Sequence, residues 1–144
     1  MVDNEKKARS AIGFETGSLT RGQMEAMLDT LPIEITFVDA EDTIRYFSKA
    51  EDRIFPRTKA IIGRKVQQCH PPKSIHIVNK VVDDLKKGRK KSADFWLDID
   101  QRKIYIRYFP VRSRDGKYLG CIEVSQDITD IQNIKGERRL LNEV

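Results

Sequence analysis

The stretch Ala60–Gly88, AIIGRKVQQCHPPKSIHIVNKVVDDLKKG, decides the fold of this chain. It opens with a short helical turn that ends at Gly63, passes through Cys69-His70-Pro71-Pro72, and continues into an amphipathic segment. This pattern predicts a helix over residues 73–87, which Gly88 ends. At 100° per residue, the apolar residues that fall on one stripe of this helix are Ile75, Val78, Val81, Val82 and Leu85.

Two short strand patterns precede this stretch, and three longer ones follow it. Residues 33–39 and 43–48 are joined by a turn that is too short for a crossover, so we predict an antiparallel hairpin. After the helix, alternating apolar residues predict strands over 92–100, 103–113 and 118–126. This order predicts an α+β fold, in which a five-stranded antiparallel sheet has helices between its second and third strands.

Two local features refine these elements. Pro110 has no N–H to donate to a ladder, so it predicts an edge or a bulge in the strand over 103–113. Thr20 and Gln23 have the spacing of a capping box, so we predict a flanking helix over residues 20–30 with Met24 and Met27 on its apolar side.

The two ends of the chain are expected to differ. Residues 1–17 carry many charges and two glycines, which indicates a flexible arm. A last helix is predicted from Asp127 through Leu141. We therefore divide the chain into an arm over 1–17, a domain over 18–130 that includes the N-terminal flanking helix, and a C-terminal signalling or dimerisation helix over 131–144.

Composition excludes several classes of protein. The 144 residues are 39% hydrophobic, and no run approaches the roughly 18 to 20 apolar residues of a membrane-spanning helix. The charged N-terminus lacks the apolar region of a secretory signal, and two cysteines make no disulfide framework. We expect a cytoplasmic protein that does not bind membranes.

The basic residues do not indicate a nucleic-acid-binding protein. The net charge is +5, and the densest basic run is 86–91. This run lies where the predicted helix ends, and cations stabilise a helix C-terminus. Aromatic residues do not interleave with it, so we expect a solvated helix end and no nucleic-acid partner.

Three short motifs resemble those of PAS domains, in the order that the predicted elements require. Ile62-Gly63-Arg64 followed by Cys69-His70-Pro71 resembles the link into the long helix of the family. The segment Arg114–Gly120 resembles the hairpin before the last strand, and Asp127-Ile128-Thr129 resembles the motif where the sheet passes into a signalling helix. The resemblance covers about residues 20–130. The stretch IRYFS…FPRT…IGRKVQQCHPPKS…FW further resembles the PAS module at the C-terminus of proteins with the DUF438 region, sometimes with a hemerythrin-like domain.

The resemblance implies a sensor. PAS domains bind a small molecule or cofactor between the long helix and the inner face of the sheet, and they signal by changing dimer geometry. We therefore expect a small-molecule ligand, a homodimer and a signalling partner domain. The apolar residues that we expect to bury in the dimer are Met24, Met27, Ile128, Ile131 and Ile134.

The two histidines allow two interpretations. Heme-binding PAS domains take an axial histidine from the long helix, and His76 falls near that position. However, His76 lies roughly 160° from the centre of the apolar stripe, which predicts a solvent-facing side chain. His70 is either a heme ligand or a structural loop residue. With Cys69 the set lacks a fourth ligand and matches no common zinc spacing, so the cofactor is unknown, with heme as one candidate.

The remaining candidate ligand-binding residues lie on the last three strands. Cys121 forms either a reversible disulfide with Cys69 or an isolated buried thiol. Glu123 points either into the cavity or into solvent, and the first orientation requires a partner such as Arg107, Tyr105 or a polar ligand. Aromatic residues that line a pocket or pack in the core are Phe95, Trp96, Tyr105 and Tyr108.

We find no arrangement of residues typical of an enzyme, because a Ser/His/Asp set and a phosphate-binding glycine loop are both missing from the sequence. The expected function is a ligand-binding, homodimeric sensor. The alternatives are a heme-based redox or gas sensor, and a ligand-free protein–protein adaptor with a filled core.

Overall fold

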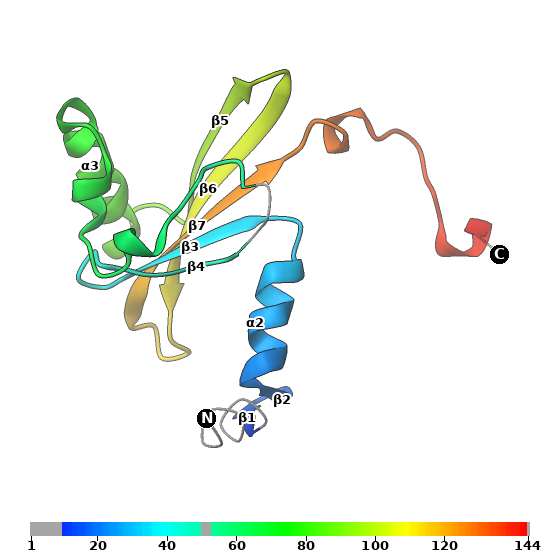
Figure 1. Cartoon of the computed structure of the whole chain (residues 1–144), viewed down its shortest axis with the longest axis horizontal. Coiled ribbons are helices and arrows are strands. Elements are labelled where there is room, and N and C mark those ends of the chain that lie inside the picture. Colours follow the sequence, from blue (N-terminus) through cyan, green and yellow to red (C-terminus); the bar gives the residue numbers. More distant parts are fainter. Residues whose placement is uncertain (1–9, 50–52, 144) are drawn as a thin grey trace.

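A five-stranded antiparallel sheet with the strand order β4-β3-β7-β6-β5 forms the body of the molecule (Figure 1). The computed structural model describes residues 10–49 and 53–143, so residues 1–9 of the expected arm lie outside it. The fold prediction is confirmed. The strands are β3 Glu34–Asp39, β4 Ile44–Phe47, β5 Ala93–Ile99, β6 Arg102–Arg112 and β7 Tyr118–Asp127.

The connection from β4 to β5 covers one face of this sheet (Figure 1). It contains three 3-10 turns, Lys59–Ile61, Val66–Cys69 and Pro72–Ser74, and then α3, Ile75–Lys86. Leu85 of the predicted apolar stripe is fully buried, as is Ile104 of β6. Burial of such residues drives the helix onto the sheet, and the predicted helix over 73–87 is confirmed within two residues.

The end of α3 is fixed by charged groups. Arg112 of β6 donates hydrogen bonds to the carbonyl oxygens of Leu85 (3.1 Å) and Lys86 (3.0 Å), which an ended helix leaves without intrahelical partners. The carboxylate of Asp84 accepts hydrogen bonds from Lys80 at 3.0 Å and from Arg89 at 2.8 Å. These bonds hold the pKa of Asp84 below its usual value. Arg89, which belongs to the basic run 86–91, is thus bound to a carboxylate at the end of α3.

Pro110 lies where one side of β6 is open. The ladder between β5 and β6 stops at the pair Ala93–Tyr108, while the ladder between β6 and β7 continues. The amide of Ile128 donates to the carbonyl of Lys103, and because hydrogen-bonding direction alternates along a strand, the nitrogen of Pro110 faces the β5 side. The predicted edge at Pro110 is confirmed, because its missing N–H falls past the end of β5.

The N-terminal segment is folded, so the expected arm is wrong over residues 10–17. Strands β1, Ala11–Phe14, and β2, Gly17–Thr20, form an antiparallel hairpin around Glu15 and Thr16. The sequence lacks the Asn-Gly or Asp-Gly turn that makes a hairpin recognisable. Its tip is tied to the β6–β7 turn by an ion pair between Glu15 and Arg114.

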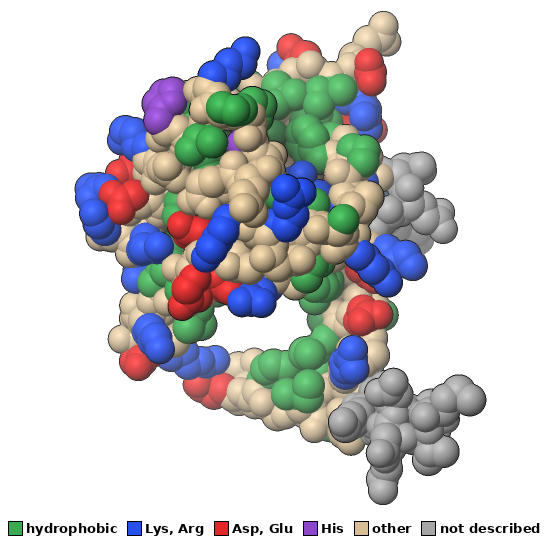
Figure 2. Space-filling view, turned by 60° about the vertical axis from the view of Figure 1, so that its left-hand side comes forward, with side chains coloured by type: hydrophobic (Ala, Val, Ile, Leu, Met, Phe, Trp, Pro, Cys, Tyr) green, Lys and Arg blue, Asp and Glu red, His purple; other side chains and the backbone are tan. Residues whose placement is uncertain are grey.

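The helix α2, Arg21–Thr30, follows this hairpin and stands away from the sheet (Figure 1). Both bonds of the predicted capping box are present: Gln23 N donates to Thr20 Oγ1, and Thr20 N donates to Gln23 Oε1. None of the residues of α2 is buried, and Figure 2 shows the opening between this part and the body. At its other end, Asp29 accepts a hydrogen bond of 2.8 Å from the amide of Lys49.

The expected helix over residues 127–141 is wrong. The described part of this segment has only two 3-10 turns, Ile131–Asn133 and Leu140–Glu143, and Gly136 has a positive φ of 66°. Most helical stability comes from packing an apolar face, and the side chains of Ile131 and Ile134 are exposed. Among the described residues, no helix has the length and apolar character that crossing a bilayer requires.

Candidate functional site

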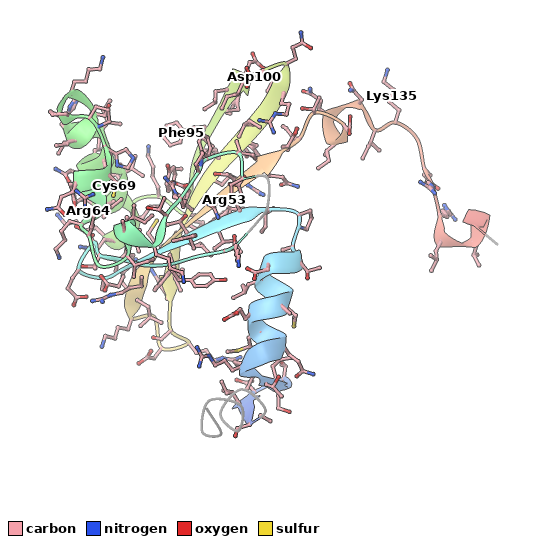
Figure 3. The ribbon with its side chains drawn as sticks, in the orientation of Figure 1. Arg53, Arg64, Cys69, Phe95, Asp100 and Lys135 are labelled. Atoms are coloured by element: carbon pink, nitrogen blue, oxygen red, sulfur yellow. The ribbon has the colours of Figure 1, made fainter. Side chains whose placement is uncertain are left out.

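A cavity of about 580 Å³ lies between α3, the β4–β5 connection and the inner face of the sheet. This volume falls within the usual range for small-molecule sites. Figure 3 shows Phe95 on β5 and Cys69 on the connection at the two sides of this space. The apolar lining consists of Val38, Ile44, Ile61, Val66, Ile77, Val78, Val81, Val82, Phe95 and Leu97.

A polar cluster occupies the wall that the central strands form. Arg57 donates a hydrogen bond of 3.1 Å to Oε1 of Glu123, and the two side chains are 26% and 17% exposed. Thr36 on β3 and Tyr108 on β6 lie directly opposite Glu123 in the sheet. Burial, together with the negative charge of the nearby Glu123 carboxylate, raises the pKa of Tyr108. Glu123 therefore faces the cavity, with Arg57 as its ion-pair partner and Tyr108 as its neighbour in the sheet.

Two polar atoms of this cluster have no hydrogen-bond partner among the residues that the structure describes. They are Oγ1 of Thr36 and Nε of Arg57, and both are buried. Thr36 is only 5% exposed as a residue. Since buried polar groups nearly always have a hydrogen-bond partner, these atoms are suited to a ligand or an ordered water.

A second ion pair holds the connection that carries Arg57. Nε of Arg53 lies 3.2 Å from Oε1 of Glu34, and each side chain is 8% exposed. The same carboxylate accepts hydrogen bonds from the amides of Ile54 (2.8 Å) and Phe55 (3.3 Å). Figure 3 shows Arg53 beside β3. Glu34 thus fixes the chain two residues before Arg57 and positions it.

The cavity also brings together Cys69, His70 and Cys121 of the predicted site residues. Both cysteines are free. Burial raises the pKa of the Cys121 thiol to about 12, so this thiol is protonated at neutral pH, whereas Cys69 is exposed. Nδ1 of His70 lies 2.9 Å from the carbonyl oxygen of Val66, which directs its other ring nitrogen away from that bond.

His76 does not line the cavity, so the cavity gives no support to its predicted role in ligand binding. It is exposed in a separate groove, with Asn79 and Lys80 of α3 and Asp42. The helical wheel had predicted this direction. A heme in the cavity therefore has His70 as its candidate axial residue. Among residues 10–49 and 53–143, His, Cys, Asp and Glu side chains form no group of three that could hold a metal ion.

Trp96, Tyr105 and Arg107 lie on the opposite face of the sheet and do not line the cavity, so their predicted role in ligand binding has no support there either. Trp96 is 66% exposed and pairs with Tyr105, whose hydroxyl donates to Asp94. The guanidinium of Arg107 lies over the ring of Tyr105, with 4.8 Å to its centroid, and donates to Gln126. Side chains alternate between the two faces along each strand. On β6, Tyr108 faces the cavity, so Tyr105 and Arg107 face the other way. On β5, Phe95 faces the cavity, so Trp96 faces the other way.

Sequence patterns did not predict four residues of the site and its support: Arg57, Thr36, Glu34 and Arg53. Glu34 and Thr36 could have been found, because they alternate with Ile33 and Ile35 and so share one face of β3. The two arginines lie in an irregular connection that has no periodicity. Only the fold brings them to the strands.

The apolar residues that we expected in a dimer interface lie outside the core. Met27, Ile131 and Ile134 are exposed, while Met24 and Ile128 are half-buried. Their role in a dimer remains a prediction.

Comparison with solved structures shows this fold in other proteins. The chain is 32% identical to a C-terminal domain from Streptococcus mutans, with a TM-score of 0.83, and the match covers 89% of this chain and 99% of that one. A PAS domain from Colwellia psychrerythraea matches at 17% identity, with a TM-score of 0.57 and coverage of 76% and 98%. A sensory box sensor histidine kinase from Vibrio cholerae matches at 17% identity and a TM-score of 0.52, with coverage of 76% and 92%.

Sequence comparison identifies the family. A search of curated proteins gives no match. The profile described as PAS domain matches residues 24–129, which is more than half of the chain, and these residues include every strand of the large sheet and α3. The chain belongs to the PAS domain family.

Proposed function

We propose that this PAS domain is a sensory module that binds a small ligand in the cavity beneath α3. The observation that carries the proposal is the pair of buried, unpartnered polar atoms, Thr36 Oγ1 and Arg57 Nε, beside a cavity of about 580 Å³. A cavity of that volume disfavours the alternative of a ligand-free adaptor with a filled core.

We further propose that the module works as a homodimer. Exposed apolar side chains on α2 and on the segment after β7 support this, because such residues cluster where proteins associate. A structural change caused by ligand binding would be transmitted to these side chains through β7. This strand carries Glu123 in the cavity and leads directly into Ile128 and Ile131.

The resemblance to PAS modules at the C-terminus of proteins with the DUF438 region stays a proposal. Its support is the 32% identity with a structure that is itself a C-terminal domain. In that setting, a partner domain of the same protein would receive the signal.

Native mass spectrometry of the protein as purified, beside its denatured mass, tests ligand binding. We expect extra mass that is lost on denaturation, and its value identifies the ligand, heme included. The control is Val81→Trp, which fills the cavity from α3 and should carry no extra mass. Equal native and denatured masses, with an unfolding midpoint that falls in Val81→Trp because a filled core cannot take the larger side chain, would favour the adaptor.

A further inference from the structure

The cluster of Arg57, Glu123, Thr36 and Tyr108 forms a polar end of the cavity, and its charges are already balanced; His70 and Ser74 also belong to the lining. Arg57 and Glu123 pair at 3.1 Å, and Tyr108 lies opposite Glu123 in the sheet. The rest of the lining is mostly aliphatic and aromatic. A group that enters the polar end therefore meets a neutral ion pair, not a single charge.

The open hydrogen-bonding positions define what that group must offer. Nε–H of Arg57 is a donor without an acceptor, so the ligand must bring an acceptor. Oγ1 of Thr36, directly across the sheet from Glu123, can either donate or accept. A carbonyl oxygen suits the first position, and an amide or hydroxyl suits the second.

Ions fit this end poorly. A carboxylate that binds Nε of Arg57 would lie close to the carboxylate of Glu123, and like charges in a desolvated site repel strongly. An ammonium group would compete with Arg57 for Glu123 and would leave a half-buried guanidinium without its partner. The ion pair selects against both signs of charge.

From these contacts we infer that the cavity takes an uncharged, mainly apolar molecule whose polar end is a carbonyl or amide. This inference rests on the proposed ligand-binding function and adds the chemical class of the ligand. Arg57, Thr36 and Glu123 are its specificity-determining residues.

Three matched probes test the inference by isothermal titration at pH 7: 4-phenylbutanamide, 4-phenylbutanoate and 4-phenylbutylamine. They share one apolar body and differ in the charge of the polar end. We expect the amide to bind at least about tenfold more tightly than either ion. Val81→Trp should abolish binding of all three.

Two charge-removing variants provide the decisive comparison. In Glu123→Gln the unpaired Arg57 should shift the preference to the carboxylate, and in Arg57→Gln the unpaired Glu123 should shift it to the amine. Each variant is first checked for folding by circular dichroism, and one folded variant suffices because the two shifts have opposite signs.

The outcomes separate the inference from the function on which it rests. If the wild-type protein prefers an ion, and Val81→Trp loses it, then the cavity binds ligands and the inference about charge is overturned. If preferences do not change in the two variants, the inference is also overturned. If no probe binds, or if binding survives in Val81→Trp, both the inference and ligand binding in this cavity lose their support.

Discussion

The guanidinium of Arg57 lies 3.1 Å from the carboxylate of Glu123, although 66 positions of sequence separate the two residues. One residue belongs to the connection over the cavity, and the other belongs to the strand that leads out of the domain. In a double-mutant cycle of Arg57→Ala and Glu123→Ala, we expect a coupling energy of roughly 1 to 3 kcal/mol in unfolding free energy. Urea denaturation measures it, and additive effects of the two changes would contradict the pairing.

Arg53 tests the support beneath that pair. Replacing it with Ala leaves the carboxylate of Glu34 buried without its ion-pair partner, so we expect a loss of about 3 kcal/mol or more in stability. The matched control is Arg45→Ala, because Arg45 pairs with Asp39 but is 58% exposed. That change should cost about 1 kcal/mol or less. Equal losses, measured by chemical denaturation, would rule out a special role for the buried pair.

Gly120 is required by the close approach of β7 to β3. It has φ of 153°, and a Cβ at this position would lie 2.1 Å from the carbonyl oxygen of Val38. Gly120→Ala should therefore cost at least about 2 kcal/mol. Gly13→Ala is the control, because its Cβ would meet nothing within 4 Å. The thermal unfolding midpoint should fall only in the first variant.

The two cysteines should react at very different rates. Iodoacetamide at pH 8 should modify the exposed Cys69 and spare Cys121, which is buried and remains a protonated thiol. Mass spectrometry counts the added groups, and Cys69→Ser should gain none until the protein is unfolded. Rapid modification of that variant in its folded state would show that Cys121 is accessible.

The same thiol makes stability depend on pH. Burial raises the pKa of Cys121 from its ordinary 9.0 to about 12, so above pH 9 the unfolded chain loses this proton more readily than the folded one. The contribution of this group to the free energy of unfolding should therefore be fully present below pH 9 and decline between pH 9 and 12. Cys121→Ser should reduce that decline when urea midpoints are compared across the range.

Ile131 tests the proposed dimer. We expect the wild-type protein to be a dimer by light scattering and Ile131→Asp to be a folded monomer, because a charge in an apolar interface is costly. Gln132→Asp, in the same turn and also exposed, introduces the same charge and should leave the dimer intact. An unchanged mass for Ile131→Asp would remove this segment from the interface.

Local patterns predicted the elements whose signals are local. The capping box of Thr20 and Gln23 and the apolar stripe that ends at Leu85 correctly located both helices. The β1–β2 hairpin had no turn signature, and the segment after Thr129 has a helical pattern but no surface in the described chain on which to fold. Both predictions failed because these segments depend on contacts with other parts of the chain, or on the lack of them, which a local sequence pattern does not record.

The site was harder to predict for a related reason. Alternation correctly grouped Cys121 with Glu123, but it could not state which face was inside. Tyr105 and Arg107 were therefore assigned to the wrong side. Arg57 has no pattern of its own, and only the register that places Thr36 and Tyr108 beside Glu123 makes the cluster visible.

Pro110 has a consequence for the protein in a crowded solution. A strand whose partner ends early exposes donors and acceptors that can recruit a strand of another molecule. On β6 this open margin begins where the pairing with β5 stops, and there the nitrogen that faces the open side belongs to Pro110 and carries no hydrogen. A strand of another molecule that paired there would lack one backbone hydrogen bond. The domain can therefore keep a long central strand without making that margin a template for aggregation.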